Sequence, residues 1–344
     1  MVASLAVKYR PRMFDDVTEQ SAIRTILEQQ IHSGQIKNCY LFCGPAGTGK
    51  TTCARIFANE INKGAGNPIE MDAASNNGVD YVRELITQAK VKSLDSDYKV
   101  FILDECHALS NSAWQAMLKI IEEPPAKSIF IFCTTDPQKI PKTILSRVQR
   151  YDFQRISYRG VVSRLLWVLD SEGYNDMDKV VDPEPIEYIA KLADGGMRDA
   201  LTMLDKCLAY SSELTLQKVV DALGAVEYDT MFDLTCKFVM KDKLGVVEII
   251  DGLYSDGKNL QQFIKQYISF MLDVIKWCIG SDWKLLKIPK LPQYEEQVEM
   301  FGHPYFNECV KLLNALVRIS SEIKYSPTVK EDIESELLLE MLYE

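Results

Sequence analysis

A glycine-rich segment, GPAGTGKT at residues 44–51, constrains the fold of this chain more than any other part. It follows an apolar run, NCYLFC, and precedes a stretch with helical spacing, TTCARIFANEI. A glycine-rich turn between a strand and a helix lets backbone N–H groups enclose phosphate oxygens, and the helix N-terminus favours the negative charge. We therefore predict a P-loop that binds a nucleoside triphosphate, with Lys50 at the β- and γ-phosphates and Thr51 as a Mg²⁺ ligand.

Short apolar runs alternate with helical patterns from residue 38 to residue 156. The later runs are NPIEMDAA, YKVFILDE and SIFIFCTT. This alternation predicts βαβ units around a mostly parallel sheet that has helices on both faces. From residue 157 the strand signals fade and apolar residues recur at helical spacing, so we expect the rest of the chain to be helical. In residues 281–300 two prolines interrupt this pattern, and we expect a loop or short turn there.

The charge of the chain is uneven. Residues 1–160 contain 20 Lys and Arg against 17 Asp and Glu, whereas the remainder contains 19 against 32. The acidic part excludes a broad nucleic-acid surface, so any contact with DNA or RNA should be local and lie in the first half. No apolar run approaches the roughly 20 residues of a membrane span, and the start does not suit a signal peptide, so we expect a cytosolic protein without a membrane partner.

The nine cysteines of the chain include no CxxC pair. We expect buried free thiols, and a metal site or a disulfide framework has little support. Cys39, Cys43 and Cys133 lie inside the apolar runs that predict strands.

Two adjacent carboxylates, Asp104 and Glu105, end the run KVFILDE. We predict that Asp104 holds Mg²⁺, in part through water, and that Glu105 polarises the attacking water. The next run ends in CTTD, where Thr134 or Thr135 could bond the γ-phosphate or this water; the alternative is a strand-end turn before Pro137. His107 follows closely, but like His32 and His303 it has no matched partner in the sequence, and we assign it a structural role.

Three arginines stand out by position. Arg198, in GGMRDAL, is expected at a helix start, where a cation opposes the helix dipole unless an anion lies near; the alternative is a surface arginine. Arg147 and Arg150 follow the run SIFIFCTT in ILSRVQR. Arginine beside a core is costly without an anion, so the sequence raises the question of which anion they meet.

Several strings occur in the order seen in AAA+ clamp loader subunits, and they resemble most closely the gamma/tau subunit of bacterial DNA polymerase III. They are YRPRMFDDV, GPAGTGKT, DAASNNGVD, LDECHALSNSAWQAMLKIIEEPP, TTDPQKIPKTILSR and GGMRDAL. The resemblance implies an α/β AAA+ P-loop core with a parallel sheet, a small helical lid and an all-α collar domain. We place the core at residues 1–156, the lid at 157–226 and the collar, which holds the oligomer together, at 227–344.

The resemblance also implies an ATPase of a DNA polymerase holoenzyme that opens a sliding clamp and places it on primer–template DNA. It needs ATP and Mg²⁺ and works in a ring, expected to be pentameric, with identical or different subunits. Thr135 matches the first sensor and Arg198 the second, and the catalytic set is completed by Lys50, Asp104 and Glu105. The expected ATP-binding residues are Tyr9, Arg10, Pro11, Val17, Gly44, Pro45, Ala46, Gly47, Thr48, Gly49, Lys50, Thr51 and Thr52.

Arg147 matches the family arginine that is donated in trans to the nucleotide of a neighbouring subunit. Such fingers raise turnover by roughly 10³- to 10⁵-fold in other NTPases. Arg150 is expected to be structural or near DNA. The resemblance places DNA at the turn and helix of ASNNGVDYVRELITQAK, where we select Asn76, Asn77 and Arg83 as backbone contacts and expect Ser75 or Asp80 to cap the helix.

The chain departs from the family at three places. The four-cysteine zinc module is replaced by NKGAGNPIEM, with no cysteine between Cys53 and Cys106, so we predict no zinc. Val148 stands where the family has the cysteine after its arginine. The expected tau extension is missing, which would suit a phage-encoded or mobile-element protein and hence a bacterial or host cytoplasm.

Two other functions stay open at this point. A branch-migration or helicase-like AAA+ motor would share the P-loop and the adjacent carboxylates, but it would lack the TTDPQKIP and EEPP strings. A non-hydrolysing scaffold subunit of a loader would not need the intact Lys50, Glu105 and Arg198.

Overall fold

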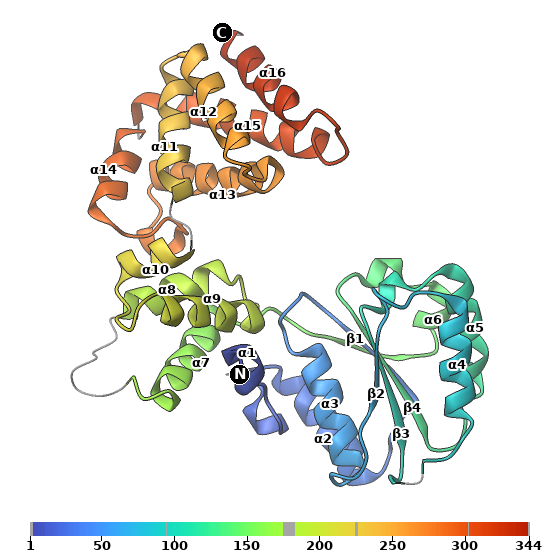
Figure 1. Ribbon diagram of the computed structural model, residues 1–344. Helices are drawn as coiled ribbons and strands as arrows, with labels where there is room; N and C mark the ends of the chain where they lie inside the picture. The colour runs from blue at the N-terminus through green and yellow to red at the C-terminus, as the bar shows by residue number, and fades with distance from the viewer. Residues whose placement is uncertain (1–2, 94, 175–182, 224–225, 302, 343–344) are drawn as a thin grey trace. The chain divides into compact units, whose positions relative to one another are not determined.

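The computed structural model describes residues 3–93, 95–174, 183–223, 226–301 and 303–342 (Figure 1). The chain forms two compact units, the first from residues 1–180 and 189–205 and the second from residues 181–188 and 206–344. The division into core, lid and collar after residues 156 and 226 stays a prediction.

A parallel sheet forms the centre of the first unit, in the strand order β2-β3-β4-β1-β5. The strands β1 and β4 are buried at every residue, as expected when helices cover both faces. This confirms the predicted parallel sheet. The strands are β1 (Cys39–Cys43), β2 (Ile69–Asp72), β3 (Lys99–Asp104), β4 (Ser128–Thr134) and β5 (Gln149–Asp152).

Alternate side chains of these strands build two apolar layers. On one face, Tyr40 and Phe42 pack with Phe57 of α3 (Lys50–Ile61) and with α2 (Ser21–Ser33). On the other face, Phe101 and Phe130 stack and contact α4 (Val79–Ala89) and α5 (Asn111–Glu122). Figure 1 shows these helix pairs on opposite sides of the sheet. Burying one such aromatic ring contributes about 1.5–3 kcal/mol, so the two layers hold the sheet in place.

The register of the sheet brings the ends of its strands to one edge. Asp72 of β2 lies opposite Asp104 of β3, and Cys43 of β1 lies opposite Thr134 of β4. Because all the strands are parallel, the P-loop after β1 and the polar residues after β3 and β4 share this edge. The edge is therefore the place to look for the site.

The other regular elements of the described chain are helices. The short 3₁₀ helices are η1 (Phe14–Asp16), η2 (Cys106–Ala108), η3 (Pro137–Lys139), η4 (Trp283–Leu285) and η5 (His303–Tyr305). The other α-helices are α1 (Leu5–Lys8), α6 (Lys142–Leu145), α7 (Tyr158–Ser171), α8 (Pro183–Leu192), α9 (Met197–Tyr210), α10 (Leu216–Leu223), α11 (Val226–Val239), α12 (Lys243–Ser255), α13 (Leu260–Cys278), α14 (Pro292–Met300), α15 (Phe306–Glu322) and α16 (Val329–Leu342).

The second unit has its own apolar core between α11 and α16. Phe232 stacks on Tyr294 and Phe301 and meets Phe270 edge-on. Asp273, which is 1% exposed, accepts backbone N–H groups of Lys287 and Ile288 and so ties the segment before α14 to α13. Most core residues of this unit lie on helices, as expected from the sequence, while Leu286 and Ile288 enter the core from the loop before α14.

Two local expectations were wrong. Residues 281–300 contain α14 as well as a loop, because Pro292 occupies a first-turn position of this helix, where its missing N–H costs nothing. Neither Ser75 nor Asp80 caps α4, whose N-cap is Gly78 without a side-chain bond. Ser75 donates instead to Asp72 at 2.8 Å, and Asp80 lies within the first turn.

The nine cysteines are free thiols, as predicted, and most are buried. Burial raises the pKa of Cys53 to about 12, so this thiol beside the P-loop stays protonated and unreactive. No helix in the described part of the chain is long and apolar enough to cross a membrane. Among the same residues, no group of three or more His, Cys, Asp and Glu could hold a metal, and the absence of zinc stays a prediction.

Candidate functional site

The P-loop between β1 and α3 adopts a backbone that requires glycine. Gly44 and Gly47 have φ values of +145° and +72°. A Cβ atom would lie 2.4 Å from the carbonyl oxygen of Phe153 at Gly44, and 2.9 Å from Cα of Gly196 at Gly47. The loop ends at Gly49, the left-handed N-cap of α3, so the unpaired N–H groups of the first helical turn face an anion site.

Lys50 brings a buried positive charge to this loop. Its side chain is 5% exposed, and Nζ donates to the carbonyl oxygens of Gly44 and Pro45, both at 2.8 Å. Burial lowers the pKa of Lys50, and the charge of Glu105 opposes this shift. Because these bonds go to neutral carbonyls, the charge of Lys50 remains available to a phosphate group.

Thr51 and Asp104 meet across the loop, as a shared Mg²⁺ site requires. Thr51 Oγ1 donates to Asp104 Oδ2 at 2.7 Å, and Asp104 Oδ1 accepts the backbone N–H of Glu105 at 3.0 Å. Hydroxyl and carboxylate oxygens are hard donors of the kind that Mg²⁺ prefers. The two side chains therefore fit the predicted ion.

A cavity of about 590 Å³ opens over the P-loop, a size typical of ligand pockets. Its lining holds more cations than carboxylates, so it suits a polyanion that retains negative charge after it binds Mg²⁺. The cations are Arg10, Lys50, Arg55, Arg164 and Arg198. The carboxylates are Asp104, Glu105 and Asp199.

Most of the predicted ATP-binding residues line this cavity. The two that do not, Gly44 and Pro45, supply the carbonyl groups that hold Lys50. The predicted residues in the lining are Tyr9, Arg10, Pro11, Val17, Ala46, Gly47, Thr48, Gly49, Lys50, Thr51, Thr52, Asp104, Glu105 and Arg198.

Residues from distant segments complete the cavity wall. Arg10 Nε donates to Thr52 Oγ1 at 3.2 Å, and burial, followed by the charge of Arg55, lowers the pKa of Arg10. Arg164 of α7 donates to the carbonyl oxygen of Tyr9 at 3.1 Å and stacks on Trp167. Neither Arg55 nor Arg164 was predicted from the sequence. Arg55 lies one helical turn after Thr51, which was a usable signal, whereas nothing in the sequence links α7 to the P-loop.

The start of α9 contacts the P-loop directly. Met197 N–H donates to the carbonyl oxygen of Gly47 at 3.0 Å, and Arg198 follows at the second position of the helix. The prediction that Arg198 begins a helix is confirmed. Arg198 and Lys50 line one cavity, where a bound anion would offset the unfavourable position of an arginine at the start of a helix.

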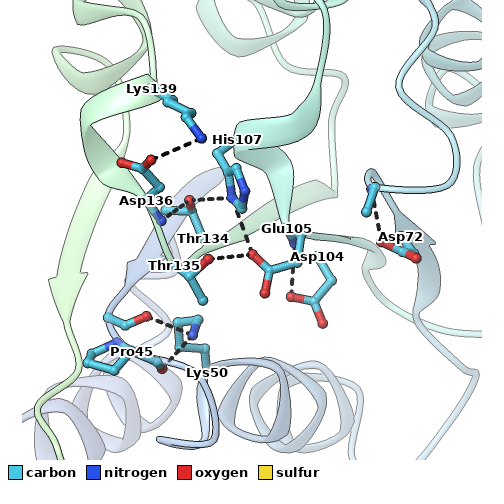
Figure 2. A network of polar contacts seen from close by, with 12 residues as sticks. Pro45, Lys50, Asp72, Asp104, Glu105, His107, Thr134, Thr135, Asp136 and Lys139 are labelled. Atoms are coloured by element: carbon cyan, nitrogen blue, oxygen red, sulfur yellow. Dashed lines mark hydrogen bonds and ion pairs between the residues drawn. The ribbon is translucent and has the colours of Figure 1, made fainter. Parts of the chain in front are cut away.

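Glu105 is held by a polar network at the ends of β3 and β4 (Figure 2). Thr135 Oγ1 donates to Glu105 Oε2 at 2.9 Å, and His107 Nδ1 lies 3.2 Å from the same oxygen. His107 Nδ1 is also 3.2 Å from Thr134 Oγ1, which accepts the N–H of Asp136 at 3.0 Å. The contact of His107 with Glu105 was missed, because spacing alone does not show which way a side chain in a 3₁₀ turn points.

Arg147 lies apart from the cavity. It forms an ion pair with Glu122 at 2.8 Å and donates to the carbonyl oxygen of Thr143 at 2.7 Å. Its side chain is 38% exposed. Nearby, Arg150 pairs with Asp152 at 2.7 Å, in line with the structural alternative for that residue. Arg147 is thus placed where it does not serve the nucleotide site of its own chain, and its role in trans stays a prediction.

The candidate DNA contacts, Asn76, Asn77 and Arg83, are all exposed. The turn that carries the two asparagines is bonded to the segment after β3. Ala73 N–H donates to the carbonyl oxygen of Asp104 at 2.9 Å, and Ser110 N–H donates to that of Asn77 at 3.1 Å. Hydrogen bonds therefore connect this turn to both ends of residues 104–110, the segment that includes Glu105. DNA binding by the turn stays a prediction.

Two family models match consecutive parts of the chain. Residues 66–157 match the DNA polymerase III delta subunit, and residues 161–213 match the ATPase lid domain of DNA polymerase III clamp loader subunits. The second match includes most of α7 and Arg198. The Bacillus subtilis DNA polymerase III subunit tau is 36% identical over 332 residues, which is 89% of this chain. This chain is a relative of the gamma and tau subunits of DNA polymerase III.

Other comparisons agree with this relationship. The gamma/tau subunit of Mycobacterium tuberculosis is 32% identical over 78% of this chain. The chain spans 58% of the Bacillus protein and 50% of the mycobacterial one. Among solved structures, the Thermotoga maritima RuvB Holliday junction branch migration motor matches with a TM-score of 0.52 and 18% identity, over 67% of this chain and 79% of that one. The RuvB match shows a shared fold and nothing beyond it.

Replacing Lys50 with alanine is expected to weaken nucleotide binding by tenfold to a hundredfold. A charge-assisted hydrogen bond contributes about 1.5–3 kcal/mol, and this cation is buried at the P-loop. Titration of a fluorescent ATP analogue measures the effect, with Lys63→Ala as a control outside the cavity. Unchanged affinity in Lys50→Ala would show that this cavity is not the nucleotide site.

Proposed function

We propose that this chain is an ATP-hydrolysing subunit of a sliding-clamp loader, which opens the clamp and places it on primer–template DNA. One observation carries the proposal: Arg198, inside the match to the clamp loader lid, lines the same cavity as Lys50 and Asp104. A lid residue at the triphosphate site lets nucleotide binding change the position of the lid. Binding and hydrolysis of ATP at the P-loop can thereby move the lid.

The side chains at the cavity divide the work of phosphoryl transfer. Lys50 and the N–H groups of the P-loop bind the β- and γ-phosphates, while Thr51 and Asp104, whose side chains meet at 2.7 Å, would hold Mg²⁺. When bound, the ion neutralises charge that develops on the phosphates. Glu105 accepts a proton from the attacking water, and Thr135 orients this carboxylate.

Assembly and DNA complete the proposed cycle. Arg147 of one subunit stabilises the transition state at the nucleotide of its neighbour, in a ring that we expect to contain five subunits. The family relationship supports other loader subunits, the clamp and primed DNA as partners in the cytoplasm. Asn76, Asn77 and Arg83 hold the DNA backbone, a form of contact that reads shape and not sequence. We expect no zinc.

A branch-migration motor is the second candidate, because the RuvB structure has the same fold. The match of residues 161–213 to a clamp loader lid favours the loader. A scaffold subunit without hydrolysis is the third candidate, and the pairing of Thr51 with Asp104 beside Glu105 argues against it.

ATP hydrolysis by the purified complex, measured with and without the co-purifying clamp and primed DNA, separates these functions. Stimulation that requires clamp and primed DNA together is the expected result. Stimulation by DNA alone, with strand exchange or unwinding, would identify a motor. Binding of ATP without turnover under every condition would identify a scaffold.

A further inference from the structure

Two side chains contact one oxygen of the Glu105 carboxylate: the hydroxyl of Thr135 donates to Oε2, and His107 Nδ1 lies 3.2 Å from the same atom. Thr135 reaches Oε2 from the end of β4, and His107 reaches it from η2 (Figure 2). No donor to Oε1 of Glu105 is found among the described residues. The network therefore distinguishes the two oxygens, since Oε2 is occupied by the protein and Oε1 is left for a water molecule.

The contact with His107 assigns its tautomer. A carboxylate only accepts hydrogen bonds, so a ring nitrogen 3.2 Å from it is favourable when that nitrogen carries a proton. The hydroxyl of Thr134 accepts the backbone N–H of Asp136. Toward His107 Nδ1 the same hydroxyl can either accept or donate a hydrogen bond. With Glu105 present, Nδ1–H is the form that satisfies both neighbours.

The backbone conformation of Glu105 is a further reason why its side chain needs the contacts with Thr135 and His107. Glu105 adopts φ +46° and ψ +41°, the left-handed region, which a residue with a Cβ atom rarely adopts. A strained residue persists only where its surroundings hold it. Contacts from β4 and η2 on the same carboxylate oxygen supply that restraint at the point where the carboxylate must stay in place.

We propose that His107 is a positioning residue for Glu105: its Nδ1–H holds Oε2 so that Oε1 faces the attacking water. The proposal rests on the proposed ATPase function for its catalytic consequence, but the tautomer of His107 is independent of turnover. His107 itself contacts neither Mg²⁺ ligand in the structure, Thr51 nor Asp104.

The tautomer is tested by NMR of the full chain with ¹⁵N-labelled histidine, and the three histidines are assigned by single substitution. We expect His107 to carry its proton on Nδ1. In Glu105→Ala the hydroxyl of Thr134 can donate to Nδ1, so the proton should move to Nε2. Wild-type protein with an unprotonated Nδ1, or a tautomer that does not respond to Glu105→Ala, would overturn the proposal.

The consequence for catalysis is tested with His107→Ala, His107→Asn and the control His32→Ala, whose ring contacts the carbonyl oxygen of Glu28 on α2. Loss of positioning should lower kcat by about tenfold to a hundredfold and leave ATP affinity unchanged. Asparagine offers an N–H close to the position of Nδ1 and should recover most of the rate, whereas His32→Ala should match the wild type.

Each outcome of the kinetic test decides the question. An unchanged kcat in His107→Ala would overturn the positioning role, as would equal losses in the alanine and asparagine variants. Thermal unfolding of both variants is measured to confirm that they are folded. A folded His107→Ala variant with a low kcat, together with a His107→Asn variant with a nearly normal kcat, supports the positioning role. If the wild-type complex binds no ATP, the proposed function fails, while the NMR result still decides whether Glu105 holds the histidine.

Discussion

Glu105→Gln is expected to bind ATP as tightly as the wild type and to hydrolyse it roughly 10²- to 10⁴-fold more slowly. Glutamine keeps the size of the side chain and can still accept the hydrogen bond of Thr135. It cannot take a proton from water at neutral pH, so the loss falls on the chemical step. Single-turnover hydrolysis, together with equilibrium binding of ATP, separates chemistry from affinity.

A matched control is available in Glu123→Gln, which changes an exposed carboxylate at the end of α5 outside the cavity. This variant should hydrolyse ATP at the wild-type rate. If Glu105→Gln also turned over at that rate, another group would be the base, and the network around Glu105 would be structural.

Arg147→Ala is expected to leave ATP binding by the isolated chain intact and to lower turnover in the assembly by roughly 10³- to 10⁵-fold. The expectation follows from placement. Arg147 is bound to Glu122 and Thr143 and does not line the cavity of its own chain. A guanidinium that completes a transition state must therefore do so at the nucleotide of another subunit. Steady-state hydrolysis by the complex, compared with ATP binding by the single chain, measures both parts.

The control for this change is Arg150→Ala, which removes the neighbouring arginine and its pair with Asp152. It should affect turnover little, because exposed ion pairs contribute only about 0–1 kcal/mol. In an assembly of identical subunits, a mixture of Arg147→Ala and Lys50→Ala chains should recover activity, since a Lys50→Ala chain can donate its intact arginine. Loss of ATP binding by the isolated Arg147→Ala chain would contradict the assignment in trans.

Local patterns predicted much of the fold correctly, because they depend on neighbouring residues. The run SIFIFCTT is apolar from Ile129 to Cys133, and in the structure β4 is buried at every residue. The prediction of a loop at residues 281–300 was wrong for the same reason, because it too used only neighbouring residues. A proline breaks a helix or begins one according to its position, and Pro292 stands at the start of α14.

Long-range contacts could not be predicted in this way. Arg164 and Tyr9 are 155 residues apart, yet they meet at the cavity through one hydrogen bond. Glu105 and Thr135 are 30 residues apart and meet because β3 and β4 are neighbours in the sheet. Their separation in the sequence carries no information about this geometry.

The sequence by itself determined which residues form the candidate phosphate site, because GPAGTGKT and the pair Asp104–Glu105 are each recognised from residues that are adjacent in the chain. Only the tertiary structure decided which distant residues share that site and how each is oriented. Parallel strand pairing brings Thr135 to the carboxylate of Glu105, and the turn after β3 directs His107 to the same oxygen. These orientations depend on packing and register, which a linear sequence does not state.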